Sequence, residues 1–210
     1  MPEYLPLSAS RQDLLPGPCR CCAWWQTAGI ARVDPRTAST VRTNWTIAME
    51  AEWGSPGLVR APEDGTPPLV GNVCAGAVHY APAANMPRLR DIITPGLPSE
   101  AVLLFCLRTD PAPDPLQARR LLHEALKELK HRRVREVFAV ATAADGAPDE
   151  ERCEFFSRDF LLADGFEQLM SWGDVCLMRV DLRGLLSVLA PIEMAWRRLL
   201  HSEPAPSPAA

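Results

Sequence analysis

The stretch Ala101-Val-Leu-Leu-Phe-Cys-Leu-Arg-Thr109 is the most informative part of this chain. Its continuous apolar run is typical of a strand that is buried on both faces, so we predict a strand over residues 100–109. After a short loop, the segment from Pro115 to His131 is predicted to be a helix, because its apolar residues recur along one stripe. Since a strand buried on both faces needs cover on each side, the sheet is expected to carry helices on both faces.

The flanking sequence adds further predicted strands and helices, separated by loops rich in proline and glycine. The first of these helices is expected to begin with Asp34 as its N-cap and Pro35 in its first turn. The expected elements are a helix over 34–53, strands over 58–60 and 69–80, a proline-rich loop over 81–98, a strand over 134–141, a helix over 150–163 capped by Gly165, strands over 166–170 and 175–181 joined by a Ser-Trp-Gly-Asp turn, and a closing helix over 185–201. This order predicts an α/β (α+β) fold with a mixed sheet.

The chain is expected to form one domain over residues 19–201. Residues 1–18 are proline-spaced and are predicted to be irregular or only locally helical, and residues 202–210 are expected to be a disordered tail. The helix over 185–201 would be ended or kinked by Pro191.

The composition excludes several classes of function. A net charge of −4 gives no basic face for nucleic acid. The longest apolar stretch, residues 101–107, is too short to cross a bilayer, and the first residues do not resemble a signal peptide. The seven cysteines are an odd number and mostly lie in apolar runs, which favours reduced thiols. We therefore expect a cytoplasmic protein without a nucleic-acid or membrane partner.

Three consecutive segments resemble the acyl-CoA core of a GNAT N-acetyltransferase. They are the predicted strand over 101–109, the helical Ala118–Lys130 and the strand at Val134–Phe138. The segment Phe155–Phe166, which closes on Leu161-Leu-Ala-Asp-Gly-Phe166, is similar to the helix and Gly-Phe ending of that superfamily. The resemblance implies a GNAT-like sheet that is mixed and mostly antiparallel.

Upstream motifs resemble one actinobacterial subgroup of the superfamily. Cys19-Arg-Cys-Cys22, followed by Trp25, is similar to the Cys-x-x-Cys-x-x-Trp opening of that subgroup, and His79-Tyr-Ala-Pro82 with the later Met86-Pro87 fits the same pattern. The resemblance covers roughly residues 19–182. It implies acetyl-CoA or another acyl-CoA as cofactor and a small-molecule amine as acceptor.

In the superfamily, a glycine-rich loop between the central strand and the next helix holds the pyrophosphate with backbone N–H groups. The matching stretch here is Pro113-Asp-Pro-Leu-Gln-Ala118, and only Ala118 fits. Pro115 removes a donor, Leu116 replaces a glycine, and Asp114 brings a negative charge. The cofactor-binding residues that the resemblance implies are Leu107, Arg108, Thr109, Leu116, Gln117, Ala118, Arg119 and Arg120.

The same stretch also has the features of a self-capped helix. Asp114 is a good N-cap, Pro115 suits the first helical position, and Gln117 would complete a capping box with Asp114. Such a helix satisfies its own N–H groups, so we predict weakened or lost binding of acetyl-CoA.

Candidates for catalysis are few. Amine acylation needs a base and often an acid, commonly a tyrosine. At the position of that tyrosine in GNAT enzymes this chain has Phe160-Leu161, and the only tyrosines are Tyr4 and Tyr80. Glu100 is the best-placed carboxylate for a base, with His79 and Glu52 as further options.

Cys19, Cys21 and Cys22 lack a second ligand pair of the kind that zinc sites use, so no metal is expected. The tryptophans of the N-terminal quarter lie where GNAT acceptors usually dock, although core packing explains at least two of them. They are Trp24, Trp25, Trp45 and Trp53.

Two hypotheses follow. The chain is a GNAT-fold protein that has lost catalysis and acts as a binding or regulatory protein with a protein partner. Alternatively, it is an active acyl-CoA-dependent N-acyltransferase with an unorthodox cofactor loop. A homodimer is compatible with both.

Overall fold

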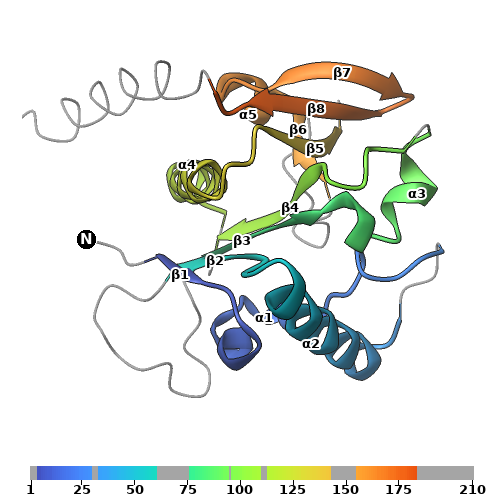
Figure 1. The fold of residues 1–210 in the computed structure, drawn as a ribbon, viewed down its shortest axis with the longest axis vertical. Helices are drawn as coiled ribbons and strands as arrows, with labels where there is room; N and C mark the ends of the chain where they lie inside the picture. The colour runs from blue at the N-terminus through green and yellow to red at the C-terminus, as the bar shows by residue number, and fades with distance from the viewer. Residues whose placement is uncertain are drawn as a thin grey trace, which may run out of the picture.

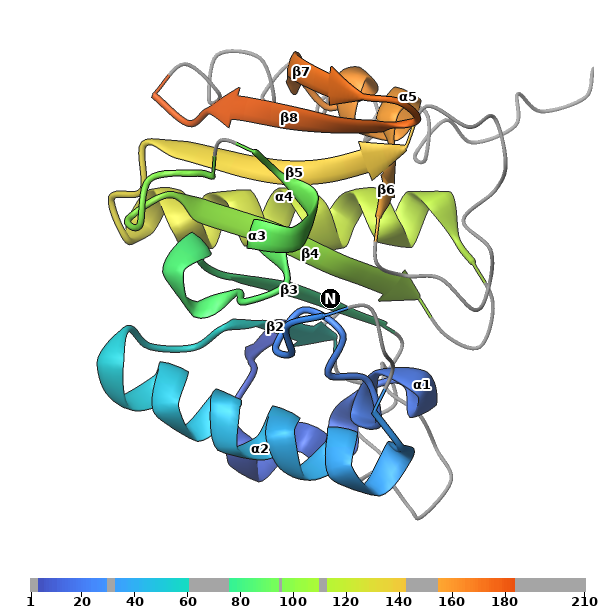
Figure 2. The same ribbon diagram turned by 90° about the vertical axis from the view of Figure 1, so that its right-hand side faces the viewer.

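The computed structural model describes residues 4–29, 33–60, 76–94, 96–109, 113–142 and 155–183. Within these residues, eight strands form one mixed sheet in the order β1-β2-β3-β4-β5-β8-β7, and β6 pairs with β5 off this path (Figures 1 and 2). Only the β4–β5 and β5–β6 pairs are parallel. The strands are β1 (Tyr4–Pro6), β2 (Gly57–Arg60), β3 (Gly76–Pro82), β4 (Val102–Thr109), β5 (Glu136–Thr142), β6 (Phe156–Ser157), β7 (Glu167–Trp172) and β8 (Val175–Asp181).

Helices cover both faces of the sheet, as predicted. The α-helices are α1 (Gly17–Arg20), α2 (Pro35–Glu52), α3 (Leu89–Ile92), α4 (Pro115–His131) and α5 (Arg158–Ala163), with 3-10 helices η1 (Ala9–Leu14) and η2 (Ala83–Asn85). Figures 1 and 2 show α4 on the face of the sheet opposite to α2 and α3. No helix among the described residues is long and apolar enough to cross a membrane.

Side chains alternate between the two faces along the central strands. Val102 and Leu104 of β4 pack in the cluster that contains α4, whereas Leu103 and Phe105 pack in the cluster that contains α2 and α3. Four leucines of α4 are fully buried, and each contributes about 2 kcal/mol relative to an exposed position. They are Leu121, Leu122, Leu126 and Leu129.

The central strand β4 leaves its parallel neighbour after only three paired residues. Val102–Leu104 pair with Val137–Ala139, and β5 then continues to Thr142 paired with β8. Just beyond this point β4 has a bulge, because the register with β3 shifts and Cys106 takes a positive φ of 50°. β4 and β5 therefore diverge toward the end of β4 that leads into α4.

The short strand β6 occupies the edge of β5 that β4 has left. Its two residues pair in parallel with Ala141 and Thr142. Those same two residues pair with β8 on their other edge, so β6 lies on the β4 side (Figure 2).

Several expected elements need correction. Residues 4–18 are locally helical in η1 and at the start of α1, as expected, but Tyr4–Pro6 forms the edge strand β1, because it pairs with β2. The expected loop over 81–98 contains the end of β3, η2 and α3. The helix expected over 150–163 starts at Arg158, because residues 156–157 pair as β6.

Other expectations fall wholly or partly outside the described residues. These are the strand over 69–75, the start of the helix at 150–154, the closing helix over 185–201 and the tail over 202–210. The helices over 34–53 and 115–131 and the strands near 58–60, 100–109, 134–141 and 175–181 are confirmed within one or two residues.

Candidate functional site

The start of α4 is closed by its own N-cap. The Asp114 carboxylate accepts hydrogen bonds from the backbone N–H groups of Leu116 at 2.9 Å and Gln117 at 3.1 Å. The Asp114 N–H in turn donates to the Thr109 hydroxyl at 2.8 Å, which brings the end of β4 beside the start of the helix. The N–H groups that a phosphate would need are therefore already bonded to a carboxylate.

The expected capping box is wrong in one part. Gln117 does not reach back to the Asp114 N–H, which Thr109 accepts instead. The Gln117 side-chain oxygen accepts a hydrogen bond from the Arg60 guanidinium, at the end of β2. The pairing with β2 could not be foreseen, because it depends on a contact 57 residues away in sequence.

The next implied anion ligand, Arg119, is also engaged. Its Nε donates to the Asp164 carboxylate at 3.0 Å, and His123 contacts the other oxygen of that carboxylate at 2.8 Å. Asp164 is buried just before Gly165, so this contact joins α4 to the end of α5. Sequence reasoning missed this cluster. Helical spacing places Arg119 and His123 on one face, but nothing local points to Asp164.

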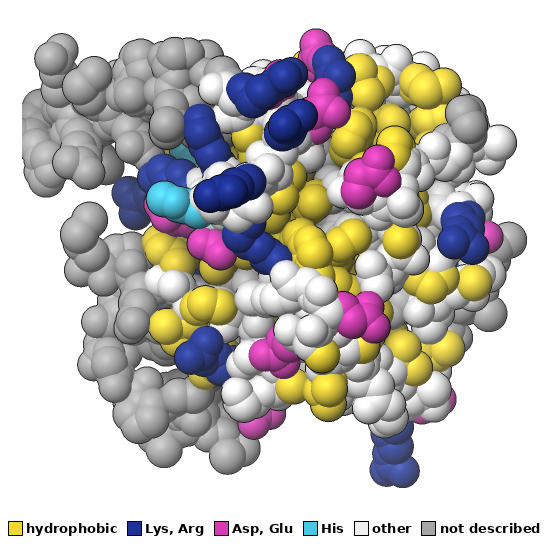
Figure 3. Space-filling model, in the orientation of Figure 1, with side chains coloured by type: hydrophobic (Ala, Val, Ile, Leu, Met, Phe, Trp, Pro, Cys, Tyr) yellow, Lys and Arg dark blue, Asp and Glu magenta, His cyan; other side chains and the backbone are white. Residues whose placement is uncertain are grey.

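The surface around α4 is mixed in charge. Figure 3 shows Lys and Arg side chains gathered there, with a histidine and acidic side chains among them. Arg120 is exposed, and Leu116 is 46% exposed beside the helix start. This is the ordinary pattern of a solvated helix rather than a basic field for phosphates.

Glu100 lies at the wrong end of β4 for chemistry near α4. It precedes the strand, and α4 follows it, so the eight residues of β4 separate the two by about 25 Å. The carboxylate is exposed, and hydrogen bonds from its own backbone N–H and from the Ser99 hydroxyl lower its pKa. The structure therefore does not bring Glu100 together with the implied cofactor residues, and its catalytic role stays a prediction. Glu52, at the exposed end of α2, is no better placed.

His79 lies at the β4 bulge but cannot act as the base in this arrangement. Its Nε2 lies within hydrogen-bond distance of the Arg42 guanidinium, which only donates, so Nε2 must be the acceptor. The other nitrogen, Nδ1, then carries the proton and donates to the Cys106 carbonyl at 3.2 Å. Burial and the neighbouring Arg42 charge hold the pKa of His79 well below its usual value. A neutral histidine with both nitrogens engaged has no free lone pair for a substrate proton.

The resemblance places the acid of GNAT enzymes at Phe160-Leu161, where this chain has two apolar side chains. Leu161 is fully buried in the core beside α4. Tyr80 is not at a strand end but in the middle of β3, and it is also fully buried. Burial raises the pKa of Tyr80, and its ring packs against Trp53 at 6.1 Å. Neither residue replaces the missing acid.

Three of the four N-terminal tryptophans join one aromatic cluster on the α2 face. Trp25 is buried and contacts Trp24 at 4.8 Å and Phe105 at 6.0 Å between ring centroids. Trp45 meets Phe105 at 6.0 Å, and Phe155 lies 5.5 Å from Trp24. The partly exposed rings are Trp24, Trp45 and Phe155. We call Trp24, Trp25, Trp45, Phe105 and Phe155 the aromatic cluster. Trp53 lies apart, under the Arg132 guanidinium.

Among the described residues no group of three or more His, Cys, Asp or Glu side chains is arranged to hold a metal ion, and Cys74 and Cys153 lie outside those residues.

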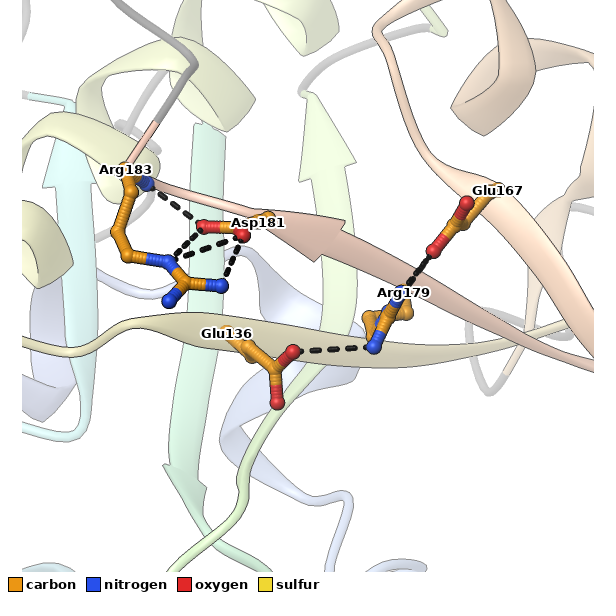
Figure 4. A network of polar contacts seen from close by, with 5 residues as sticks. All are labelled: Glu136, Glu167, Arg179, Asp181 and Arg183. Carbon is orange, nitrogen blue, oxygen red and sulfur yellow. Dashed lines mark hydrogen bonds and ion pairs between the residues drawn. The ribbon is translucent and has the colours of Figure 1, made fainter.

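Figure 4 shows an ion-pair network in which Arg179 bridges Glu136 and Glu167. In the same network, the hydrogen bonds from Arg183 lower the pKa of Asp181 to about 2. That network is exposed to solvent and ties β5, β7 and β8 together.

The overall fold of this chain is similar to that of several solved structures. PaiA N-acetyltransferase from Thermoplasma acidophilum, solved in complex with coenzyme A, matches with a TM-score of 0.53 at 15% identity, over 86% of this chain and 99% of that one. The fold is that of the GNAT acetyltransferases. Ribosomal-protein-alanine N-acetyltransferase from Brucella melitensis matches with a TM-score of 0.53 at 18% identity, over 85% and 99% of the two chains. An N-acetyltransferase from Staphylococcus aureus matches with a TM-score of 0.54 at 12% identity, over 87% and 99%.

No protein-family model matches the sequence, and no curated protein does. At these identities the likeness to GNAT structures concerns the fold alone. The predicted GNAT-like sheet is thereby confirmed, while the actinobacterial subgroup stays a prediction.

Proposed function

We propose that this chain is a GNAT-fold protein with weakened or lost acetyl-CoA binding that acts as a binding or regulatory protein. The observation that carries the proposal is the Asp114 carboxylate, which accepts the N–H groups of Leu116 and Gln117. A phosphate at this helix start would have to displace that carboxylate and would meet its negative charge.

Other contacts support the same conclusion. Gln117 is bonded to Arg60, and Arg119 to Asp164, so neither is available without breaking a buried or half-buried contact. β6 lies beside β5 in the opening that a pantetheine arm would use. The position of the catalytic tyrosine carries the buried Leu161.

The alternative, an active N-acyltransferase that uses an acyl-CoA and a small-molecule amine, is favoured by one feature of β4. The strand diverges from β5 after Leu104 and bulges at Cys106. An acyl-pantetheine would bind between these two strands if β6 moved aside. A cytoplasmic location, a protein partner and a homodimer remain part of the proposal under either reading.

Titration with acetyl-CoA separates the two functions. A ligand at one hundred times its Kd stabilises a protein by about 2.7 kcal/mol, so an active enzyme should show a clear rise in Tm at millimolar acetyl-CoA. We expect no rise for the wild-type chain. A wild-type Tm that rises with acetyl-CoA and saturates would reject the proposal in favour of the alternative.

A matched pair of variants tests the cause. Replacing Asp114, Pro115 and Leu116 with glycine frees the N–H groups at the start of α4 and should create measurable acetyl-CoA binding. The chain offers a control in Asp34→Gly/Pro35→Gly, because Asp34 caps α2 with the same two hydrogen bonds. That variant should lose similar stability without gaining acetyl-CoA binding. If the α4 variant folds and still does not bind, the helix cap is not the lesion.

A further inference from the structure

A buried arginine on the α2 face has no negative partner. Arg42 is 2% exposed, and its guanidinium donates to the Cys22 carbonyl at 3.1 Å and to His79 Nε2. Among the described residues it forms no ion pair with a carboxylate, and its Nε is buried without an acceptor. Of the five N–H donors of an arginine, two are thus engaged and at least the Nε–H is not. A buried cation without an anion is costly, which makes this position unusual.

Two more buried donors share this property, and both belong to the segment just after Cys22, whose carbonyl accepts from Arg42. The Trp25 indole Nε1 and the Gln26 side-chain Nε2 are buried and have no acceptor. Trp25 contacts Phe105, and Phe105 packs against His79 at 5.7 Å, the residue that Arg42 binds. All three unsatisfied groups are donors, so what is missing is an acceptor, and the uncompensated charge makes an anion the best complement.

A purely structural role for Arg42 does not account for this pattern. Arg88 provides the comparison, because it is also buried and also fastens the same segment. Its guanidinium donates to the Trp24 carbonyl at 2.9 Å and to the Thr27 hydroxyl at 3.1 Å, and it lies over the Trp24 ring. No buried nitrogen of Arg88 lacks an acceptor, whereas Arg42 Nε does. Fastening the chain therefore requires no unsatisfied donor, and the Nε of Arg42 needs a second explanation.

We propose that the α2 face holds a binding site for a small carboxylate with an apolar body of about the size of one ring. The carboxylate is bound by Arg42, with Trp25 Nε1 and Gln26 Nε2 as additional donors. A guanidinium offers N–H groups in a planar fork that matches a carboxylate. The body of the ligand packs against the aromatic cluster, whose half-buried rings Trp24, Trp45 and Phe155 form its solvent-facing rim.

The site is adjacent to the β4 bulge but separate from the start of α4. Arg42 reaches the bulge through His79, which donates to the Cys106 carbonyl, so a bound carboxylate would lie next to the divergence of β4 and β5. The helix α4, whose N-cap is Asp114, lies on the opposite face of the sheet (Figures 1 and 2). The inference therefore does not rest on the fate of acetyl-CoA. In a binding protein the carboxylate is the ligand, and in an acyltransferase it would be part of the acceptor.

Isothermal titration calorimetry with sodium phenylacetate tests the site, with sodium acetate and sodium chloride as parallel ligands at constant ionic strength. We expect saturable heat and a rise in Tm with phenylacetate, a weaker effect with acetate, and none with chloride. No saturable heat from phenylacetate at millimolar concentration would overturn the proposal. Equal responses to chloride and phenylacetate would overturn the assignment to a carboxylate.

Variants test the residues. Arg42→Lys keeps the charge but loses the fork, and should raise the Kd for phenylacetate by about tenfold or more. Trp25→Phe keeps a ring but removes the N–H, and should raise it by about threefold to tenfold. The matched control is Arg132→Lys, which should leave the Kd unchanged within about twofold because Arg132 lies over Trp53, apart from the aromatic cluster, and has no unsatisfied buried donor. If Arg42→Lys fails to fold, Trp25→Phe and Gln26→Leu decide. Unchanged affinity in both, or an equal loss in Arg132→Lys, would refute the site.

Discussion

The buried His79 should make the stability of this fold sensitive to mild acid. Burial and the Arg42 charge hold its pKa well below the ordinary value, so His79 stays neutral in the native state. In the unfolded chain the same side chain takes up a proton near pH 6.5. Below that pH the unfolded state binds more protons than the native state, so stability falls as the pH falls toward the native pKa.

The size of the effect follows from one proton. Between about pH 7.5 and about pH 5.5 the unfolded chain goes from mostly neutral to mostly charged at this position. For an unfolded pKa of about 6.5 and a native histidine that does not titrate in this range, the loss is about 1.4 kcal/mol. Urea denaturation at the two pH values measures it.

His79→Gln is the matched variant for this measurement. The glutamine amide can accept from Arg42 and donate to the Cys106 carbonyl, yet it carries no charge at either pH. The other histidines are common to both proteins, so the difference between their pH dependences isolates His79. We expect the variant to lose about 1.4 kcal/mol less than wild type on acidification. An equal loss in both proteins would show that His79 titrates in the native state, and the neutral tautomer derived above would be incorrect.

Four further substitutions have defined outcomes in urea denaturation or thermal melting. Asp114→Ala and Asp34→Ala should each cost about 1 kcal/mol, because each carboxylate accepts two N–H groups at a helix start, and a tolerated change would show the cap to be unimportant. Asp164→Asn should lower the free energy of unfolding by about 2 kcal/mol, because it weakens the buried carboxylate that binds His123 and the partly exposed Arg119. An unchanged stability would contradict that geometry. Gly57→Ala should cost about 3 kcal/mol, because the added Cβ would lie 2.4 Å from the backbone oxygen of Val78, and a wild-type Tm would contradict this close packing.

The secondary structure was predictable where the signal is local. The strand over 102–109 is an apolar run, and α4 carries its leucines at helical spacing, so both were found nearly to the residue. β1 and β6 were missed because they contain only three and two residues. Strands so short form only because a neighbouring strand pairs with them, and the sequence of the short segment does not indicate which strand will be its neighbour.

The candidate site was predictable to a smaller degree. The helix cap at Asp114 could be seen in the sequence and is confirmed by the structure. The contacts of His79 could not be predicted, because a histidine before a tyrosine gives no sign of which groups face it. The Asp164 contact and the unsatisfied donors near Arg42 were not foreseen, since buried polar groups are defined by what lies across the core.

The closed start of α4 is what the sequence by itself determined about this protein. Asp114, Pro115 and the N–H groups of the first turn are neighbours along the chain, so their chemistry follows from their order. The tertiary structure alone decided the rest. Arg42 meets His79 across 37 residues and Arg119 meets Asp164 across 45, and such contacts exist only after the sheet has brought distant segments together. The physical reason is range: a cap acts within one helical turn, whereas burial and charge pairing depend on the whole fold.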